Sequence, residues 1–115
     1  MSPELQKLLS PVKLAGLELR NRVIKTATFE GMTPEAAPTQ RLIDFHVSLV
    51  KGGVGLTTVG QCNVSADARN LDNEMYFHEG IREGLVKLTQ AVHAHGGKIS
   101  AQFTHCGYFK LNKPL

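Results

Sequence analysis

The sequence lacks the features that mark several large protein classes. It has no apolar run of about 18 residues, so it predicts no transmembrane helix. Its first residues, MSPELQKLLSPVKL, lack the apolar core of a secretory signal peptide. Two cysteines without such a signal favour a reducing compartment. A chain of 115 residues normally forms one domain, so we expect a single soluble domain, cytoplasmic or organellar.

Positive charge is present but is not concentrated. Thirteen Lys and Arg against ten Asp and Glu give a formal net charge of +3, and the basic residues are scattered. Nucleic-acid surfaces usually need a basic stripe or cluster, so we expect no nucleic-acid partner, and no membrane partner either. The sequence also lacks a GxGxxG after a strand and a GxxxxGK[ST] loop. It therefore gives no support for a dinucleotide fingerprint or a P-loop.

The chain does contain strands that alternate with helices. Periodicity and turn residues predict a hairpin turning at Ala15-Gly16, then strand, helix, strand, helix, strand. These elements occupy Ser10–Arg22, Arg22–Phe29, Leu42–Val50, Val54–Cys62, Ile81–Val92 and Lys98–His105. Thr39 is the expected N-cap of the first helix, and double glycines end both helices. This alternation implies parallel strands joined by right-handed crossovers.

A weak internal repeat brings polar residues to one edge of the predicted sheet. KGGVGLTTV and HGGKISAQF share an arrangement, and Cys62 and Cys106 each lie ten residues past the first glycine of their pair. Both cysteines should therefore follow the C-terminal ends of neighbouring parallel strands. That edge is where α/β proteins bind ligands. The polar residues expected there are Thr26, Thr28, Gln61, Gln102, Thr104 and His105.

Several chemistries are open at this edge. Gln102 offers both donors and an acceptor, so it could pair with a flat heterocycle or simply bond nearby backbone. His105 and Cys106 are adjacent and would point to opposite faces of a strand, which disfavours a nucleophilic pair. With Cys62 they lack a fourth zinc ligand and CxxC spacing, so we expect no metal. A Cys62–Cys106 disulfide is conceivable but disfavoured by compartment. His46 is expected to be structural.

Three stretches together resemble one family. LLSPVKLAGLELRNRVIKTATFEGM, KGGVGLTTVGQCNVSADAR and AVHAHGGKISAQFTHCGYF are similar, in order and spacing, to the N-terminal part of the old yellow enzyme family. These are FMN-dependent NADH:flavin oxidoreductases related to the 2,4-dienoyl-CoA reductases. The resemblance runs from about Leu8 to the end of the chain. It implies that residues 1–115 form a partial FMN-binding (β/α)8 barrel domain: the base hairpin Val12–Leu19, the first three strands and the first two helices.

The resemblance also implies which residues would meet FMN. They are Ala27, Thr28, Phe29, Gly60, Gln61 and Gln102. The first three would lay their backbone against the isoalloxazine ring after strand one. The next two would approach its pyrimidine side from the end of strand two, and the last would pair with its pyrimidine edge. Phe29 stands where many relatives place Thr, Cys or His, so side-chain hydrogen bonding to the flavin would be absent there. His105 would shape the site.

The implied reaction runs from NAD(P)H through FMN to an activated alkene. A complete (β/α)8 barrel needs about 250 residues, so the chain would be an N-terminal fragment that is inactive alone. The family's substrate-binding His/Asn or His/His pair, its proton-donating Tyr and its phosphate loops would all lie beyond Leu115. Two alternatives stay open. One is a non-catalytic binding or assembly module that pairs its open sheet edge with another chain. The other is an unrelated small α/β binding domain.

Overall fold

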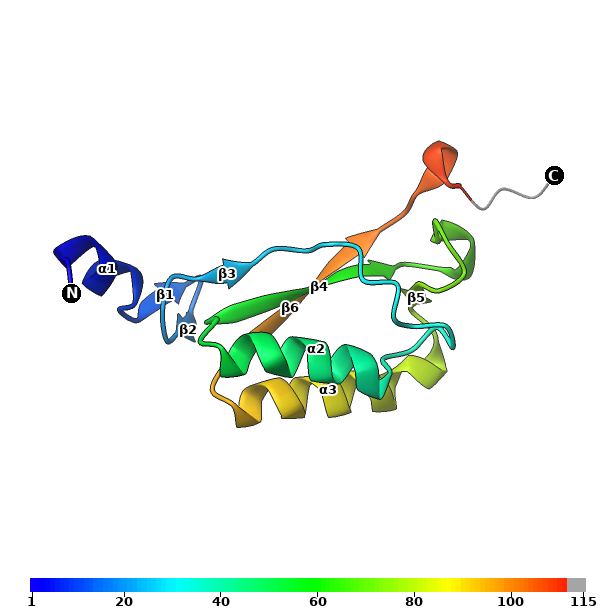
Figure 1. The fold of residues 1–115 in the computed structure, drawn as a ribbon. Coiled ribbons are helices and arrows are strands. Elements are labelled where there is room, and N and C mark those ends of the chain that lie inside the picture. Colours follow the sequence, from blue (N-terminus) through cyan, green and yellow to red (C-terminus); the bar gives the residue numbers. More distant parts are fainter. Residues whose placement is uncertain (112–115) are drawn as a thin grey trace.

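A parallel sheet forms the centre of the molecule. The computed structural model describes residues 1–111. The four strands of the sheet are β3 (Ile24–Lys25), β4 (Leu56–Asn63), β5 (Met75–Tyr76) and β6 (Lys98–Thr104). β4 pairs with β3 and then β5 along one side and with β6 along the other, always in parallel. Helices α2 (Gln40–Lys51) and α3 (Arg82–Ala94) lie on the same face of the sheet (Figure 1).

The predicted hairpin is present at the end of the sheet where the strands begin (Figure 1). Strands β1 (Val12–Leu14) and β2 (Leu17–Leu19) are antiparallel and turn at Ala15-Gly16. The φ angles of these two residues are +48° and +82°, as a tight two-residue hairpin turn requires. A short helix, α1 (Pro3–Leu8), precedes the hairpin and was not predicted. It buries no residue, so no apolar stripe marks it in the sequence.

The first predicted strand is much shorter than expected. Of Arg22–Phe29, only Ile24–Lys25 pairs with β4. Further along β4, its pairing with β6 shifts at a bulge between Val59 and Cys62. A bulge bends its strand and interrupts the ladder. Beyond it β5, which the sequence did not reveal, takes the place of β3 beside β4. The residues after β3 therefore run as an extended loop.

Helix α2 begins where the sequence predicts. The Thr39 hydroxyl accepts a hydrogen bond from the Leu42 amide at 3.2 Å, as an N-cap should. Its buried face is rotated from the predicted stripe, because Phe45 and Leu49 are only half-buried. The buried residues of α2 are Leu42, Ile43, His46 and Val50. A histidine thus occupies a core position that apolar periodicity alone does not assign.

Helix α3 and the core follow the predicted pattern closely. A 3₁₀ turn, Glu79–Ile81, leads into α3, and the exposed pair Glu83–Lys87 forms at 2.7 Å. The core between helices and sheet consists of Leu42, Ile43, Val50, Val59, Cys62, Met75, Ile81, Leu88 and Val92. A Cβ on Gly97 would lie 2.5 Å from the Val50 side chain, so this glycine lets the start of β6 approach α2.

The element order confirms the expected fold class. β3–α2–β4–α3–β6, with a hairpin at the base, is the start of a (β/α)8 barrel, and the sheet does not close. Short 3₁₀ turns at Ala66–Ala68 and Gly107–Phe109 complete the architecture. None of the helices within residues 1–111 combines the length and the hydropathy of a transmembrane span.

Candidate functional site

The bulge in β4 aligns three of the predicted site residues across the sheet. Because the pairing of β4 with β6 shifts between Val59 and Cys62, Gly60 and Gln61 face a single residue on β6, Gln102. Bulges of this kind re-aim side chains and are common beside active sites. The position lies toward the C-terminal ends of the parallel strands, the edge at which barrels of this type bind their ligands.

The loop after β3 packs directly against this bulge. A Cβ on Gly60 would lie 2.7 Å from the Thr28 backbone nitrogen and 2.9 Å from the Ala27 Cβ. No side chain fits at that distance, so glycine is required for the close approach. The structure therefore brings Ala27, Thr28, Gly60, Gln61 and Gln102 together, although they come from three separate segments.

Gln102 presents a free amide at this place. Its side chain is exposed and makes no hydrogen bond to any residue in the described part of the chain. Thr28 is also exposed, with one long bond of 3.5 Å from its hydroxyl to Thr26 O. An amide with donors and an acceptor suits the mixed donor and acceptor edge of a planar heterocycle. The sequence left two roles open for the Gln102 amide. Among the described residues, it does not bond to nearby backbone, which was one of them.

Phe29 lies at the margin of the cluster. Its side chain is 54% exposed, and its ring lies beside Gly31, where an added Cβ would come within 3.0 Å of it. His105 is likewise exposed, and its Nδ1 accepts from the Gly107 amide at 3.1 Å. That bond shapes the turn after β6.

The Gln61 side chain is engaged in a second polar network. Its amide nitrogen donates to Glu74 Oε1 at 2.9 Å and to Cys106 Sγ at 3.6 Å. Glu74 is only 2% exposed and also accepts from the Asn63 amide at 3.1 Å. Thr104 on β6 donates to Asn63 Oδ1 at 2.9 Å. Gln61 therefore reaches the site through its backbone, while its side chain ties β4 to the following loop.

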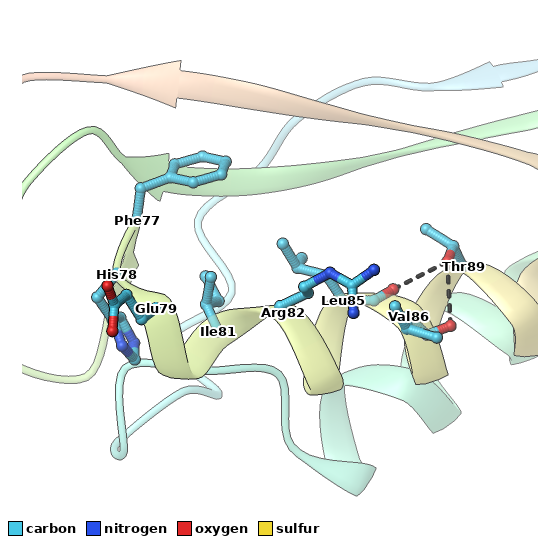
Figure 2. Close-up of a pocket in the computed structure, with 8 residues that line it drawn as sticks. All are labelled: Phe77, His78, Glu79, Ile81, Arg82, Leu85, Val86 and Thr89. Atoms are coloured by element: carbon cyan, nitrogen blue, oxygen red, sulfur yellow. Dashed lines mark hydrogen bonds between the residues drawn. The ribbon is translucent and has the colours of Figure 1, made fainter.

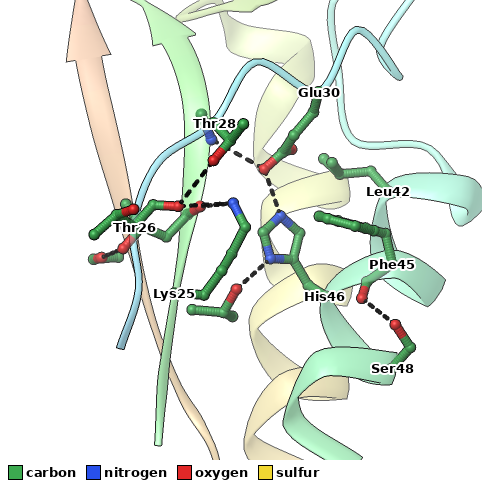
Figure 3. Close-up of polar contacts among 12 residues, drawn as sticks. Lys25, Thr26, Thr28, Glu30, Leu42, Phe45, His46 and Ser48 are labelled. Carbon is green, nitrogen blue, oxygen red and sulfur yellow. Dashed lines mark hydrogen bonds and ion pairs between the residues drawn. The ribbon is translucent and has the colours of Figure 1, made fainter. Parts of the chain in front are cut away.

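A third polar group lies behind the loop after β3 (Figure 3). His46 contacts Thr57 and Glu30, and Glu30 also bonds the Gly60 amide. The sequence predicts a structural role for His46 but does not reveal these partners. The position of His46 beside the apolar stripe of its helix could have indicated such partners, because a buried polar group needs a hydrogen-bonding partner.

Both cysteines are free thiols, so the disfavoured disulfide is not formed. Burial raises the pKa of the Cys62 thiol to about 11. Cys106 is half-buried at the end of β6. Among residues 1–111, no cluster of three or more His, Cys, Asp or Glu side chains could hold a metal ion.

An apolar hollow lies elsewhere, along the first turns of α3 (Figure 2). Its volume is ≈ 570 Å³. Figure 2 shows Phe77 above the helix and Ile81, Leu85 and Val86 along it. The full lining is Phe77, His78, Glu79, Ile81, Arg82, Leu85, Val86 and Thr89. None of the predicted flavin contacts lines it, so the hollow is separate from the bulge site.

The chain is similar to known proteins over most of its length. The sequence profile of the NADH:flavin oxidoreductase / NADH oxidase family matches residues 7–111. A 4,4'-dithiodibutanoate disulfide reductase of Rhodococcus erythropolis is 42% identical over 100 residues, covering 87% of this chain and 25% of that protein. A multifunctional alkene reductase/demethylase of Caballeronia cordobensis is 31% identical over 102 residues, covering 87% of this chain and 15% of that protein.

Solved structures show the same relationship. Morphinone reductase in complex with tetrahydroNAD superposes with a TM-score of 0.79 at 29% sequence identity. The match covers 87% of this chain and 27% of the morphinone reductase chain. The chain thus spans about a quarter or less of the length of the relatives it matches.

Proposed function

The chain belongs to the NADH:flavin oxidoreductase / NADH oxidase family, and we propose that it supplies one wall of an FMN site in an NAD(P)H-dependent ene-reductase. The observation that carries the proposal is the alignment of Thr28, Gly60 and Gln102 at the β4 bulge. The exposed Thr28 and the exposed Gln102 amide thus lie on either side of the buried Gly60, toward the C-terminal ends of the strands.

The residues present suit a flavin. In this proposal the backbone of Ala27, Thr28 and Phe29 lies against the isoalloxazine ring. The Gln102 amide pairs with the pyrimidine edge, which offers both donors and acceptors. Gln61 contributes backbone alone, because its amide nitrogen is bonded to Glu74. Phe29 offers no hydrogen bond, so this wall orients the ring without a side-chain donor at that position.

Bound FMN would supply hydride transfer, from NAD(P)H to the flavin and on to an activated alkene. The nicotinamide donor is supported by the tetrahydroNAD complex of morphinone reductase, and the alkene acceptor by the alkene reductase relative. The residues of this chain bind and orient the ring. We propose none of them as the donor of the proton that completes alkene reduction.

The test is a titration of the purified chain with FMN, followed by amide NMR spectra. We expect binding in roughly the millimolar range, with shifts at Thr28, Gly60 and the Gln102 side chain. Gln102→Ala should weaken binding by about two- to tenfold, the value of one hydrogen bond. The matched control is Gln90→Ala, which removes an exposed glutamine from α3 and should bind like wild type. Shifts that avoid the bulge, or none at all, would refute the proposal.

The second candidate is an assembly module. It is favoured by β6, which pairs only with β4 among the described strands and exposes Ser100 to Phe103 in succession. An unpaired strand edge is a template for another chain. In the same titration, concentration-dependent association without any flavin-induced shift would favour this candidate.

A further inference from the structure

Glu30, His46 and Thr57 form a buried polar chain behind the candidate flavin site (Figure 3). The His46 side chain is 0% exposed, and both ring nitrogens have partners. Nδ1 lies 2.7 Å from Thr57 Oγ1 on β4, and Nε2 lies 2.9 Å from Glu30 Oε1. A carboxylate can only accept, so Nε2 donates to Glu30. The ring is therefore held between the sheet and the loop after β3.

The same carboxylate oxygen holds the bulge of β4. Glu30 Oε1 also accepts from the Gly60 backbone amide at 3.1 Å. Gly60 in turn lies against Thr28 at a distance that excludes a Cβ. One oxygen atom thus fixes helix α2, the bulge and the loop relative to one another.

The loop is fixed at both ends by charged groups. At its start, the Lys25 ammonium donates to Thr26 O at 2.8 Å. At its end, Glu30 makes the two bonds just described. Between these anchors lie residues 27–29, beyond the last residue of β3. These three residues are the part of the loop that our proposed function places against the flavin.

Stability alone does not account for this arrangement. A buried hydrogen-bonded pair can often be replaced by apolar residues of similar volume without loss of stability, whereas removal of one partner leaves the other unsatisfied and is costly. The Glu30–His46 pair does fix the position of the loop after β3. Packing of the loop residues cannot do so, because Thr28 and Phe29 are exposed. We propose that Glu30 and His46 are positioning residues of the flavin site, an inference that rests on the proposed function. They hold residues 27–29 at the spacing from Gly60 that lets the ring lie against them.

Hydrogen exchange of the flavin-free chain tests the geometry directly. Glu30→Leu removes the acceptor at similar size, whereas Glu30→Gln keeps an oxygen that can accept both bonds. We expect the Gly60 amide to exchange about tenfold faster in Glu30→Leu and close to wild type in Glu30→Gln. The control is Val92→Ala, which opens the core under α3 and leaves the loop untouched. Unchanged Gly60 exchange in Glu30→Leu would overturn the inference.

FMN affinity is the second readout. Glu30→Leu and His46→Leu should weaken FMN binding by about tenfold, and Glu30→Gln by less than about threefold. Val92→Ala creates a cavity in the core and should therefore lower the melting temperature. Well below that temperature, the FMN affinity of this variant should match wild type. If Glu30→Leu binds FMN as Val92→Ala does, the pair is only structural and the inference falls while the proposed function stands. If wild type shows no FMN-induced shift, both fall.

Discussion

At the scale of single residues, the site depends on buried polar groups. Glu30, His46 and Glu74 are each enclosed, and each has hydrogen-bond partners from other segments. Glycine at 60 is needed because backbone occupies the space of its side chain. Of the residues that would touch the ligand, Thr28, Phe29 and Gln102 are exposed, whereas Gly60 is buried and Gln61 is half-buried and hydrogen-bonded. The site therefore combines buried, hydrogen-bonded groups with exposed side chains that a ligand could contact.

Cys62 gives a pH-dependent prediction at this scale. Burial raises its pKa from 9.0 to about 11, so the folded state disfavours the thiolate. The unfolded chain ionises first as pH rises, so the stability associated with the neutral thiol is present below pH 9.0 and is lost between pH 9.0 and about 11. Cys62→Ser removes this titration, so urea midpoints measured from pH 8 to 11 should fall less steeply in that variant.

Thiol labelling provides the independent check. The rate of thiol modification depends on the thiolate fraction and on solvent access. At pH 8 a disulfide reagent should therefore modify the half-buried Cys106 before the buried Cys62. Cys62 should react only when the chain unfolds. Rapid modification of both cysteines in the folded protein would contradict the buried, neutral state of Cys62.

At the scale of elements, Arg20 joins the hairpin to both helices. Its guanidinium donates to Val54 O at 2.8 Å, to His95 O at 2.9 Å and also to Val50 O. These carbonyls lie at or just beyond the C-terminal ends of α2 and α3, where helices carry unpaired acceptors and favour a cation. One side chain therefore fixes the base of both βα units.

Replacement of Arg20 should destabilise the fold measurably. Arg20→Met removes the three bonds, and we expect a loss of about 2–4 kcal/mol in the free energy of unfolding, since bonds from charged groups contribute about 1.5–3 kcal/mol each and are not additive. The control is Arg22→Met, an exposed arginine two residues away, which should change stability by less than about 0.5 kcal/mol. Equal urea midpoints for the two variants would show that Arg20 does not anchor the helices.

At the scale of the whole molecule, the sheet is open. β6 pairs on one side within the described residues, and Phe103 on it is 60% exposed beside Phe77, with ring centroids 5.1 Å apart. Parallel sheets are normally covered on both faces. The exposed strand and its aromatic pair are thus the surface that further barrel elements, or another chain, would cover.

We predict that the isolated chain self-associates through this edge. Phe103→Lys should shift sedimentation toward the monomer at about 100 μM, because charge on an edge strand opposes pairing. Phe109→Lys is the control, since Phe109 is 85% exposed but lies in the 3₁₀ turn outside the strand. If both variants dissociate the protein equally, exposed aromatic surface drives association rather than the β6 edge.

Local patterns in the sequence predicted much of this molecule. The hairpin turn at Ala15-Gly16, the Thr39 cap and the apolar spacing from Ile81 to Val92 depend on residues within a turn or two of one another. The alternation of strands and helices was enough to indicate parallel strands joined by right-handed crossovers. The barrel and the family were implied by the resemblance of three sequence stretches to the old yellow enzyme family. The six flavin contacts remain predictions.

The sequence by itself therefore determined the order of the hairpin, the two long helices and the three strands around them, and where polar residues follow those strands. It did not indicate α1 or β5. Only the tertiary structure decided where β3 stops, which face of α2 is buried, and that Glu30 meets both His46 and Gly60. These partners are 16 and 30 residues apart in the chain. Periodicity reports burial within one element, whereas a bulge and a buried polar pair depend on how separate elements approach one another. That approach is settled only when the sheet and its helices pack together.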